Sequence, residues 1–131
     1  MLDIIFLLNS DWVILFIRIV LGAVMIYYGL PKIRDLKSNA DDFVEMGLKP
    51  GWLWGAIVAS VEFLGGIAVI LGVWAELAAF LFAIEMAVGA IWKITKRKET
   101  FTDWSYDLIL IAISLTVITF GPGVYSVLPL F

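Results

Sequence analysis

The sequence predicts an all-α integral membrane protein: a bundle of four transmembrane helices, with a short amphipathic element between helices 1 and 2. Composition is the first observation, because 63% of the 131 residues are hydrophobic and only 16% are charged. An average soluble domain has roughly 25% charged residues, and a soluble fold of this size cannot bury so much apolar surface. The second observation is a set of four apolar stretches, each near the ~20 residues that a bilayer core requires.

The predicted membrane helices follow these stretches, and residues 1–131 are expected to form a single domain. The helices span about residues 12–30, 52–74, 75–92 and 104–120. Aromatic residues lie near many of the helix ends, where an interfacial belt is expected: Trp12, Tyr27, Tyr28, Trp52, Trp54, Trp74, Trp92, Trp104 and Tyr125. The segment Met1–Ser10 has no basic region and no small-residue cleavage site, so we expect an interfacial segment and not a secretory signal.

The connection between the first two membrane helices favours a short amphipathic helix that lies against the bundle. Ser38 or Asn39 can cap its start. Asp41 and Asp42 then fall in its first turn, where the helix dipole favours negative charge.

The basic residues of the loops predict the orientation. All eight loop cations fall in segments 31–51 and 93–103: Lys32, Arg34, Lys37, Lys49, Lys93, Lys96, Arg97 and Lys98. Short loops rich in Lys and Arg stay in the cytoplasm. We therefore expect both loops to be cytoplasmic and both termini to lie outside. The net charge of −3 and the lack of a basic stripe argue against a nucleic-acid partner.

Two residue types are absent from the sequence, which contains neither cysteine nor histidine. Thiol chemistry and thiolate or imidazole metal sites are therefore excluded within this chain, and no metal site is predicted. The chain is expected to have no intrinsic cofactor. Any redox function must use the cofactor of a partner protein or a bound small molecule.

Three ionisable residues fall inside the predicted membrane helices. Arg18 lies roughly 10 Å from the outer end of its helix, and Glu62 and Glu85 lie roughly 15–17 Å deep. Each charge costs about 2.5–3.5 kcal/mol on insertion scales, so we expect the three side chains to point inward and to pair. Asp107 lies nearer the cytoplasmic end of the last helix. A solvated or interfacial role is favoured for Asp107, although it is also a candidate for the ligand or proton site.

Small residues share helix faces with these charges, which indicates close helix packing. The stripes are Arg18, Gly22, Met25 and Gly29; Gly55, Ala59, Glu62 and Gly66; and Glu85 with Gly89. Arg18 with two glutamates leaves one surplus negative charge, so we expect one carboxyl group to hold a proton. The cluster could bind a ligand head group or relay protons. Alternatively, it could only fix the helix register.

In order and spacing, several motifs resemble the DoxX/DoxD-like family of small four-helix membrane proteins. They run through nearly the whole chain: R-I-V-L-G-A-V-M-I-Y-Y-G-L-P-K from Arg18, F-V-E-M-G from Phe43, V-E-F-L-G-G-I-A-V-I-L-G from Val61, Glu85 before Met86, and G-P-G-V-Y-S from Gly121. The sequence departs from the family in two places. Relatives often have Glu where this chain has Asp107, and many have an acidic tail where this chain has Ser126–Pro129.

The resemblance implies a prokaryotic plasma-membrane protein of a functionally mixed family. Some members are similar to membrane subunits of oxidoreductases, including thiosulfate:quinone oxidoreductase, and more distant relatives resemble membrane chaperones. The leading hypothesis is a membrane subunit of a redox system, in which the Arg18–Glu62–Glu85 cluster binds a quinone-like ligand or docks a redox partner. The alternative is a non-enzymatic scaffold or assembly factor. A transporter is a third hypothesis, and it would require a homo-oligomer because four helices are few for alternating access.

Overall fold

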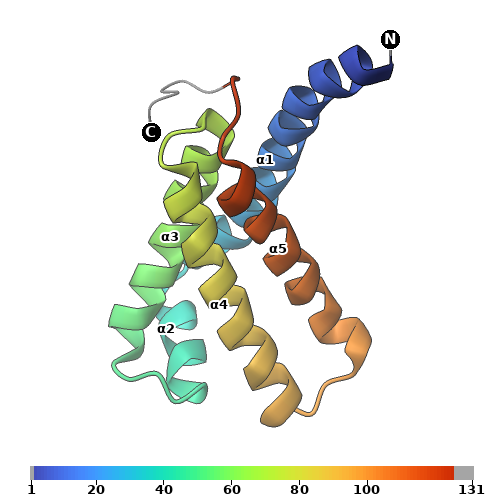
Figure 1. Ribbon diagram of the computed structural model, residues 1–131. Helices are drawn as coiled ribbons and strands as arrows, with labels where there is room; N and C mark the ends of the chain where they lie inside the picture. Colours follow the sequence, from blue (N-terminus) through green and yellow to red (C-terminus); the bar gives the residue numbers. More distant parts are fainter. Residues whose placement is uncertain (1, 126–131) are drawn as a thin grey trace.

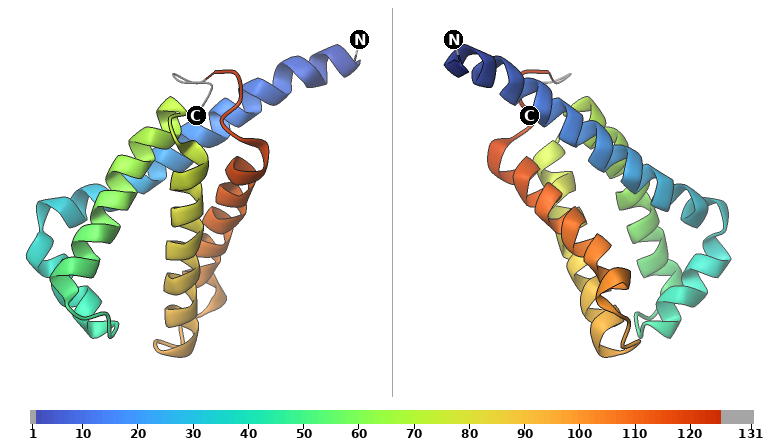
Figure 2. Two further views of the ribbon diagram at one scale, coloured as in Figure 1. Left: turned by 60° about the vertical axis from the view of Figure 1, so that its left-hand side comes forward. Right: turned by 90° about the vertical axis from the view of Figure 1, so that its right-hand side faces the viewer.

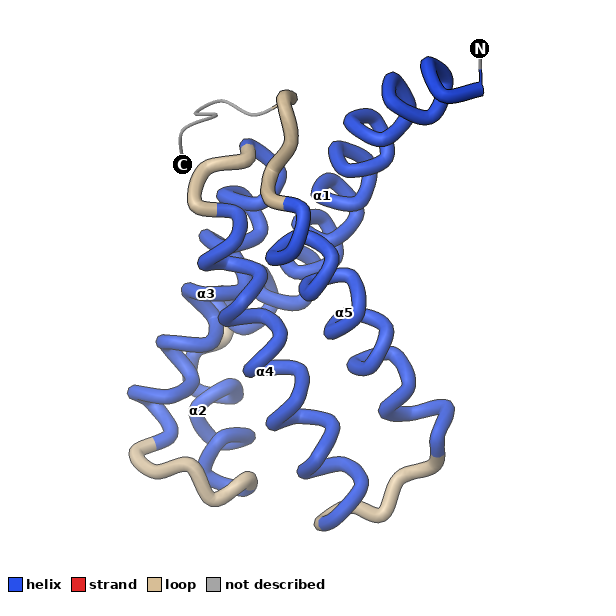
Figure 3. Tube along the Cα trace, viewed as in Figure 1, coloured by secondary structure: helices blue, strands red, loops and turns tan. Residues whose placement is uncertain are grey.

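The computed structural model describes residues 2–125, with the side chains described from residue 11 onward. It contains five α-helices (Figure 1). Their bounds are α1 Leu2–Arg34, α2 Leu36–Glu45, α3 Gly51–Leu71, α4 Ala75–Thr95 and α5 Phe101–Phe120. Helices and short loops account for residues 2–125 without a strand (Figure 3). The departure from the family at Ser126–Pro129 lies outside the described residues.

Four of the helices are long and apolar enough to cross a membrane. The candidate spans are Asp11–Arg34, Gly51–Leu71, Ala75–Thr95 and Phe101–Phe120, with mean hydropathy from 1.4 to 2.3. The predicted all-α membrane fold with a short helix after the first span is confirmed. The protein is therefore an integral membrane protein, and the outer faces of these helices face a lipid bilayer.

Helix α1 is longer than the predicted 12–30. It is continuous from Leu2, so residues 2–10 extend the helix, and they project beyond the bundle (Figure 1). The predicted span ended at about residue 30, just before Pro31, but α1 continues to Arg34. Proline removes only its own N–H donor, and the carbonyl of Pro31 still accepts a hydrogen bond from Asp35 N at 3.1 Å.

The other helix ends were shifted by capping signals that the hydrophobic pattern hides. Helix α3 ends at Leu71 and not at residue 74, because Gly72 adopts the left-handed conformation that closes the helix. Helix α5 begins three residues before Trp104, where Thr100 and Asp103 form a capping box.

The expected cap of the short helix was wrong. Asp35 caps α2, and its side chain accepts a hydrogen bond from Ser38 N at 3.1 Å. Asn39 lies inside α2, is buried, and donates from Nδ2 to Gly55 O at 2.8 Å. This bond fastens α2 to the start of α3.

The helices pack as two antiparallel pairs, α1 with α3 and α4 with α5, and the pairs meet near the turn between α3 and α4 (Figure 2). Most of the buried apolar residues gather in that half of the bundle, among them Leu21, Val69, Ala79 and Phe82. We call the opposite end the basic end, because it contains residues 32–51 and 93–101. Toward the basic end the two pairs diverge (Figure 2).

Candidate functional site

Glycines set the distance between α1 and α3. A Cβ on Gly29 would lie 2.8 Å from Phe63 N and 2.9 Å from Glu62 Cβ, and a Cβ on Gly66 would lie 2.7 Å from Gly22 O. These distances are too short for any residue larger than glycine, so the two backbones touch. The register that follows brings Gly29 of α1 to the level of Glu62 of α3.

Lys32 lies one helical turn beyond Gly29 on the same face of α1. Its Nζ lies 2.6 Å from Oε1 of Glu62, forming an ion pair across the α1–α3 contact. Glu62 is 1% exposed, so its charge depends on this partner. The other carboxylate oxygen, Oε2, is buried and has no hydrogen-bond partner within residues 2–125.

Glu85 of α4 belongs to the same cluster. It interacts electrostatically with both Glu62 and Lys32. Its Oε2 atom is also buried without a hydrogen-bond partner among the described residues. A second carboxyl group, from the facing helix α4, thus lies beside the Lys32–Glu62 ion pair. Glu62 was expected to pair with Arg18, but its cation is Lys32.

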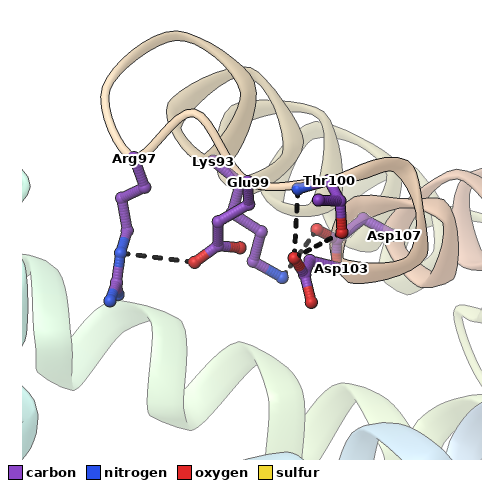
Figure 4. A network of polar contacts seen from close by, with 6 residues as sticks. All are labelled: Lys93, Arg97, Glu99, Thr100, Asp103 and Asp107. Carbon is purple, nitrogen blue, oxygen red and sulfur yellow. Dashed lines mark hydrogen bonds and ion pairs between the residues drawn. The ribbon is translucent and has the colours of Figure 1, made fainter.

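A second ion pair joins α4 to α5. Lys93 Nζ lies 2.9 Å from Oδ2 of Asp107, which is only 7% exposed (Figure 4). Of the solvated or interfacial role favoured for Asp107, the solvated alternative is therefore wrong, because the carboxylate is buried and paired with a lysine in the last turn of α4. Around the loop, Arg97 pairs with Glu99 at 3.3 Å, and the capping box fixes the start of α5 (Figure 4).

Both ion pairs line one cleft of about 830 Å³ in the basic half of the bundle. Its walls come from all five helices, and most of the lining side chains are apolar. The charged or hydroxyl-bearing residues that line it from the membrane spans are Tyr28, Lys32, Glu62, Glu85, Lys93, Asp103, Tyr106 and Asp107. Within the described part of the chain, no three acidic side chains gather as a metal site requires.

Arg18 lies outside this cleft, so the predicted Arg18–Glu62–Glu85 cluster does not form. The guanidinium group of Arg18 is 1% exposed and donates to four main-chain carbonyls. Nε donates to Val69 O at 2.9 Å, Nη2 to Ile70 O at 2.7 Å, and Nη1 to Pro122 O at 2.7 Å and Tyr125 O at 2.6 Å.

The carbonyls at the end of α3 explain why Arg18 bonds there. The last carbonyls of a helix have no partner within the helix, and a guanidinium group offers several donors in a planar fork. Glu62 lies seven residues earlier in α3 than Val69, roughly 10 Å along the axis. Arg18 thus joins α1, the end of α3 and the segment after α5, and Glu62 pairs with a lysine at the basic end.

Gly89 differs from the other glycines expected to pack helices. A Cβ there would have no atom within 4 Å, whereas Gly22, Gly29 and Gly66 are all in tight contact. Gly89 lines the cleft instead. The expected helix-packing role for Gly89 was therefore wrong, since α3 and α4 have already diverged at this level.

Sequence reasoning missed the two lysines, which were assigned to the loops. A signal was available in the stripes themselves. Lys32 follows Gly29 by three residues, so it lies on the same face of the first membrane helix. Lys93 follows Gly89 by four residues and extends the face that contains Glu85 and Gly89. Each lysine thus lies on the inward face of its helix, close to the helix end.

The DoxX family model matches residues 13–95, which is more than half of the chain and includes Arg18, its contacts with the end of α3 and the Lys32–Glu62 pair. The chain belongs to the DoxX family. The matched segment contains α2, α3 and α4 in full and ends just after Lys93, so in this DoxX protein α5 with Asp107 lies beyond it.

One curated relative of this DoxX protein is the Bacillus subtilis (strain 168) protein named "Putative oxidoreductase CatD". It is 25% identical over 101 residues, which cover 77% of this chain and 73% of the relative. No solved structure matches the chain.

Proposed function

We propose that this DoxX-family protein is a membrane subunit of a redox system, and that its cleft binds a quinone-like ligand. The observation that carries the proposal is a largely apolar cleft of about 830 Å³ with two lysine–carboxylate pairs in its walls. Small-molecule sites are typically about 300–1,000 Å³, mostly apolar, with a few polar groups that fix orientation. The name of the Bacillus subtilis relative supports a redox role.

A quinone fits the chemistry of this lining. It is a flat apolar ring whose two carbonyl oxygens accept hydrogen bonds. Lys32 and Lys93 lie on different walls of the cleft, and an ammonium group has three N–H donors, of which the pairing carboxylate takes one. Each lysine can therefore donate to a ligand oxygen while it keeps its ion pair.

The two glutamates can meet a second requirement of a quinone site, which is a supply of protons. Reduction of a quinone to a quinol consumes two electrons and two protons. Glu62, Glu85 and Lys32 together carry one surplus negative charge when both carboxyls are ionised, and burial disfavours an unpaired charge. In the proposed reaction, one carboxyl group of the cluster passes a proton to a ligand oxygen, and water at the basic end supplies the second proton.

In this proposal the electrons come from the cofactor of a partner redox protein. The chain contains neither cysteine nor histidine, which are the usual ligands of iron–sulfur clusters and most haems. The subunit would therefore bind the electron acceptor and deliver protons, and the partner would supply the electrons.

Quinone binding to the purified protein tests the proposal, with decylubiquinone as the probe. Quenching of tryptophan fluorescence is a suitable readout, because Trp54 and Trp92 line the cleft. We expect Lys32→Met to weaken binding by about tenfold, the loss of roughly one charge-assisted hydrogen bond. Lys96→Met is the matched control, because Lys96 is exposed and does not line the cleft.

If no member of a panel of benzoquinones and naphthoquinones binds, the quinone proposal is wrong. A scaffold or assembly role would then be the better explanation, with the ion pairs acting only to hold the helices together. Equal affinity of the wild-type protein and Lys32→Met would contradict the assignment of this lysine to the site.

A further inference from the structure

The cleft opens sideways between α3 and α4. Five residues of these helices line the cleft and have exposed side chains: Trp54, Ile57, Leu81, Ile84 and Val88. All five are apolar and lie within candidate membrane spans. The rim of this opening therefore faces the hydrocarbon of the bilayer and not water.

The side between α1 and α5 has two exposed aromatic side chains in place of an aliphatic rim. There Tyr28 of α1 and Tyr106 of α5 meet edge to face, with ring centroids 5.8 Å apart. Both rings line the cleft, so this aromatic contact bridges the two helices at the level of the ion pairs. The cleft thus has an aromatic bridge on one side and an apolar rim on the other.

We propose that the opening between α3 and α4 holds the apolar tail of a membrane-dissolved, single-tailed amphiphile whose polar head lies against the lysine–carboxylate pairs. This inference rests on the proposed function for the nature of the head and adds the tail as a second determinant of binding. Both the charged cleft and the bilayer hydrocarbon stabilise the binding of such a molecule. Its head meets the buried charges, and its tail stays in the hydrocarbon while the head is bound.

The arrangement of the walls supports a ligand with this shape. The charged groups Lys32, Glu62 and Glu85 come from the inward faces of their helices, whereas Ile57 and Ile84 flank the outward path. A polar head without a tail would leave the apolar rim in contact with lipid alone. A bulky side chain on the rim should therefore exclude the tail without touching the groups that bind the head.

Two quinones with the same head separate the two contributions: decylubiquinone and the tailless dimethoxy-methyl-benzoquinone. The test variant is Ile84→Trp, on the rim of the opening. The matched control is Ile91→Trp, in the same helix, since Ile91 is exposed to lipid but does not line the cleft. We expect Ile84→Trp to weaken decylubiquinone binding by about tenfold and to change tailless binding less than about twofold. We expect Ile91→Trp to change neither.

Two results would overturn the inference while leaving quinone binding intact. One is equal affinity of the wild-type protein for both quinones. The other is an equal loss of both in Ile84→Trp, since a rim that serves only the tail cannot weaken the tailless probe.

If neither quinone binds the wild-type protein, the proposed function fails, and native mass spectrometry of protein extracted from its own membrane decides the inference separately. A long-chain molecule retained by the wild type and by Ile91→Trp, but lost from Ile84→Trp, supports the lateral opening with a different head group. Equal retention by all three proteins, or retention of none, overturns it.

Discussion

Lys32 and Glu62 form an ion pair of 2.6 Å between two helices whose backbones touch at Gly29. The two partners are unequal, because Glu62 is buried whereas about a third of the Lys32 side chain is exposed, at 32%. Lys32 could turn toward water at the basic end if Glu62 lost its charge. Glu62, fixed by the helix contact, has no such alternative.

This asymmetry predicts the effect of removing each partner. Lys32→Met leaves the Glu62 carboxylate buried without its cation, and we expect it to lower the free energy of unfolding by about 2–4 kcal/mol. Glu62→Gln should cost less, because the lysine can reach the interface. The double variant should be more stable than Lys32→Met alone, since both charges are then gone. Unfolding in mixed detergent measures all three, and strictly additive losses would contradict the pairing.

Arg18 is predicted to be structural, because it bonds four carbonyls and does not line the cleft. Arg18→Lys keeps the charge but lacks the planar fork, and we expect a loss of about 2–4 kcal/mol in unfolding free energy. Quinone affinity of the folded protein should be unchanged. The exposed Arg34, changed to Lys, is the control for stability. A selective loss of affinity in Arg18→Lys, without loss of stability, would return Arg18 to the ligand site.

Substitution by alanine is expected to have opposite effects on stability at Gly29 and at Gly89. Gly29→Ala places a methyl group 2.8 Å from Phe63 N, so we expect α1 and α3 to separate and the melting temperature to fall. Gly89→Ala meets no atom within 4 Å, and it should raise stability by up to about 1 kcal/mol through helix propensity. Thermal melting in detergent compares the two. Equal destabilisation by both changes would contradict the difference in packing.

The distribution of basic residues predicts that the loop between α4 and α5 is cytoplasmic. The absence of cysteine makes single-cysteine labelling clean. In intact cells, Lys98→Cys should be protected from a membrane-impermeant maleimide, and Glu76→Cys, at the exposed start of α4, should react. Permeabilised cells control for reactivity, because both positions should then be labelled. Labelling of Lys98→Cys alone in intact cells would reverse the orientation.

Much of the fold could be predicted from the sequence, because a membrane helix is fixed by local composition. Apolar length and aromatic ends give the four spans, and the small residues at Gly22, Gly29 and Gly66 mark faces that lie against other helices. Helix ends were less predictable. Pro31 suggested an end that α1 passes, and the end of α3 at Gly72 depends on a turn within an unbroken apolar stretch.

Hydrophobicity and a 3.6-residue period are properties of each segment, so the presence of charges inside the membrane and the helix faces that carry them follow from local sequence. Their partners depend on the tertiary structure. Arg18, Lys32 and Lys93 have long side chains, and the atom each one reaches depends on the register and spacing of neighbouring helices. Arg18 lies beside the last carbonyls of α3, and the lysines lie beside the carboxylates. That difference places the charged cleft in the basic half of the bundle.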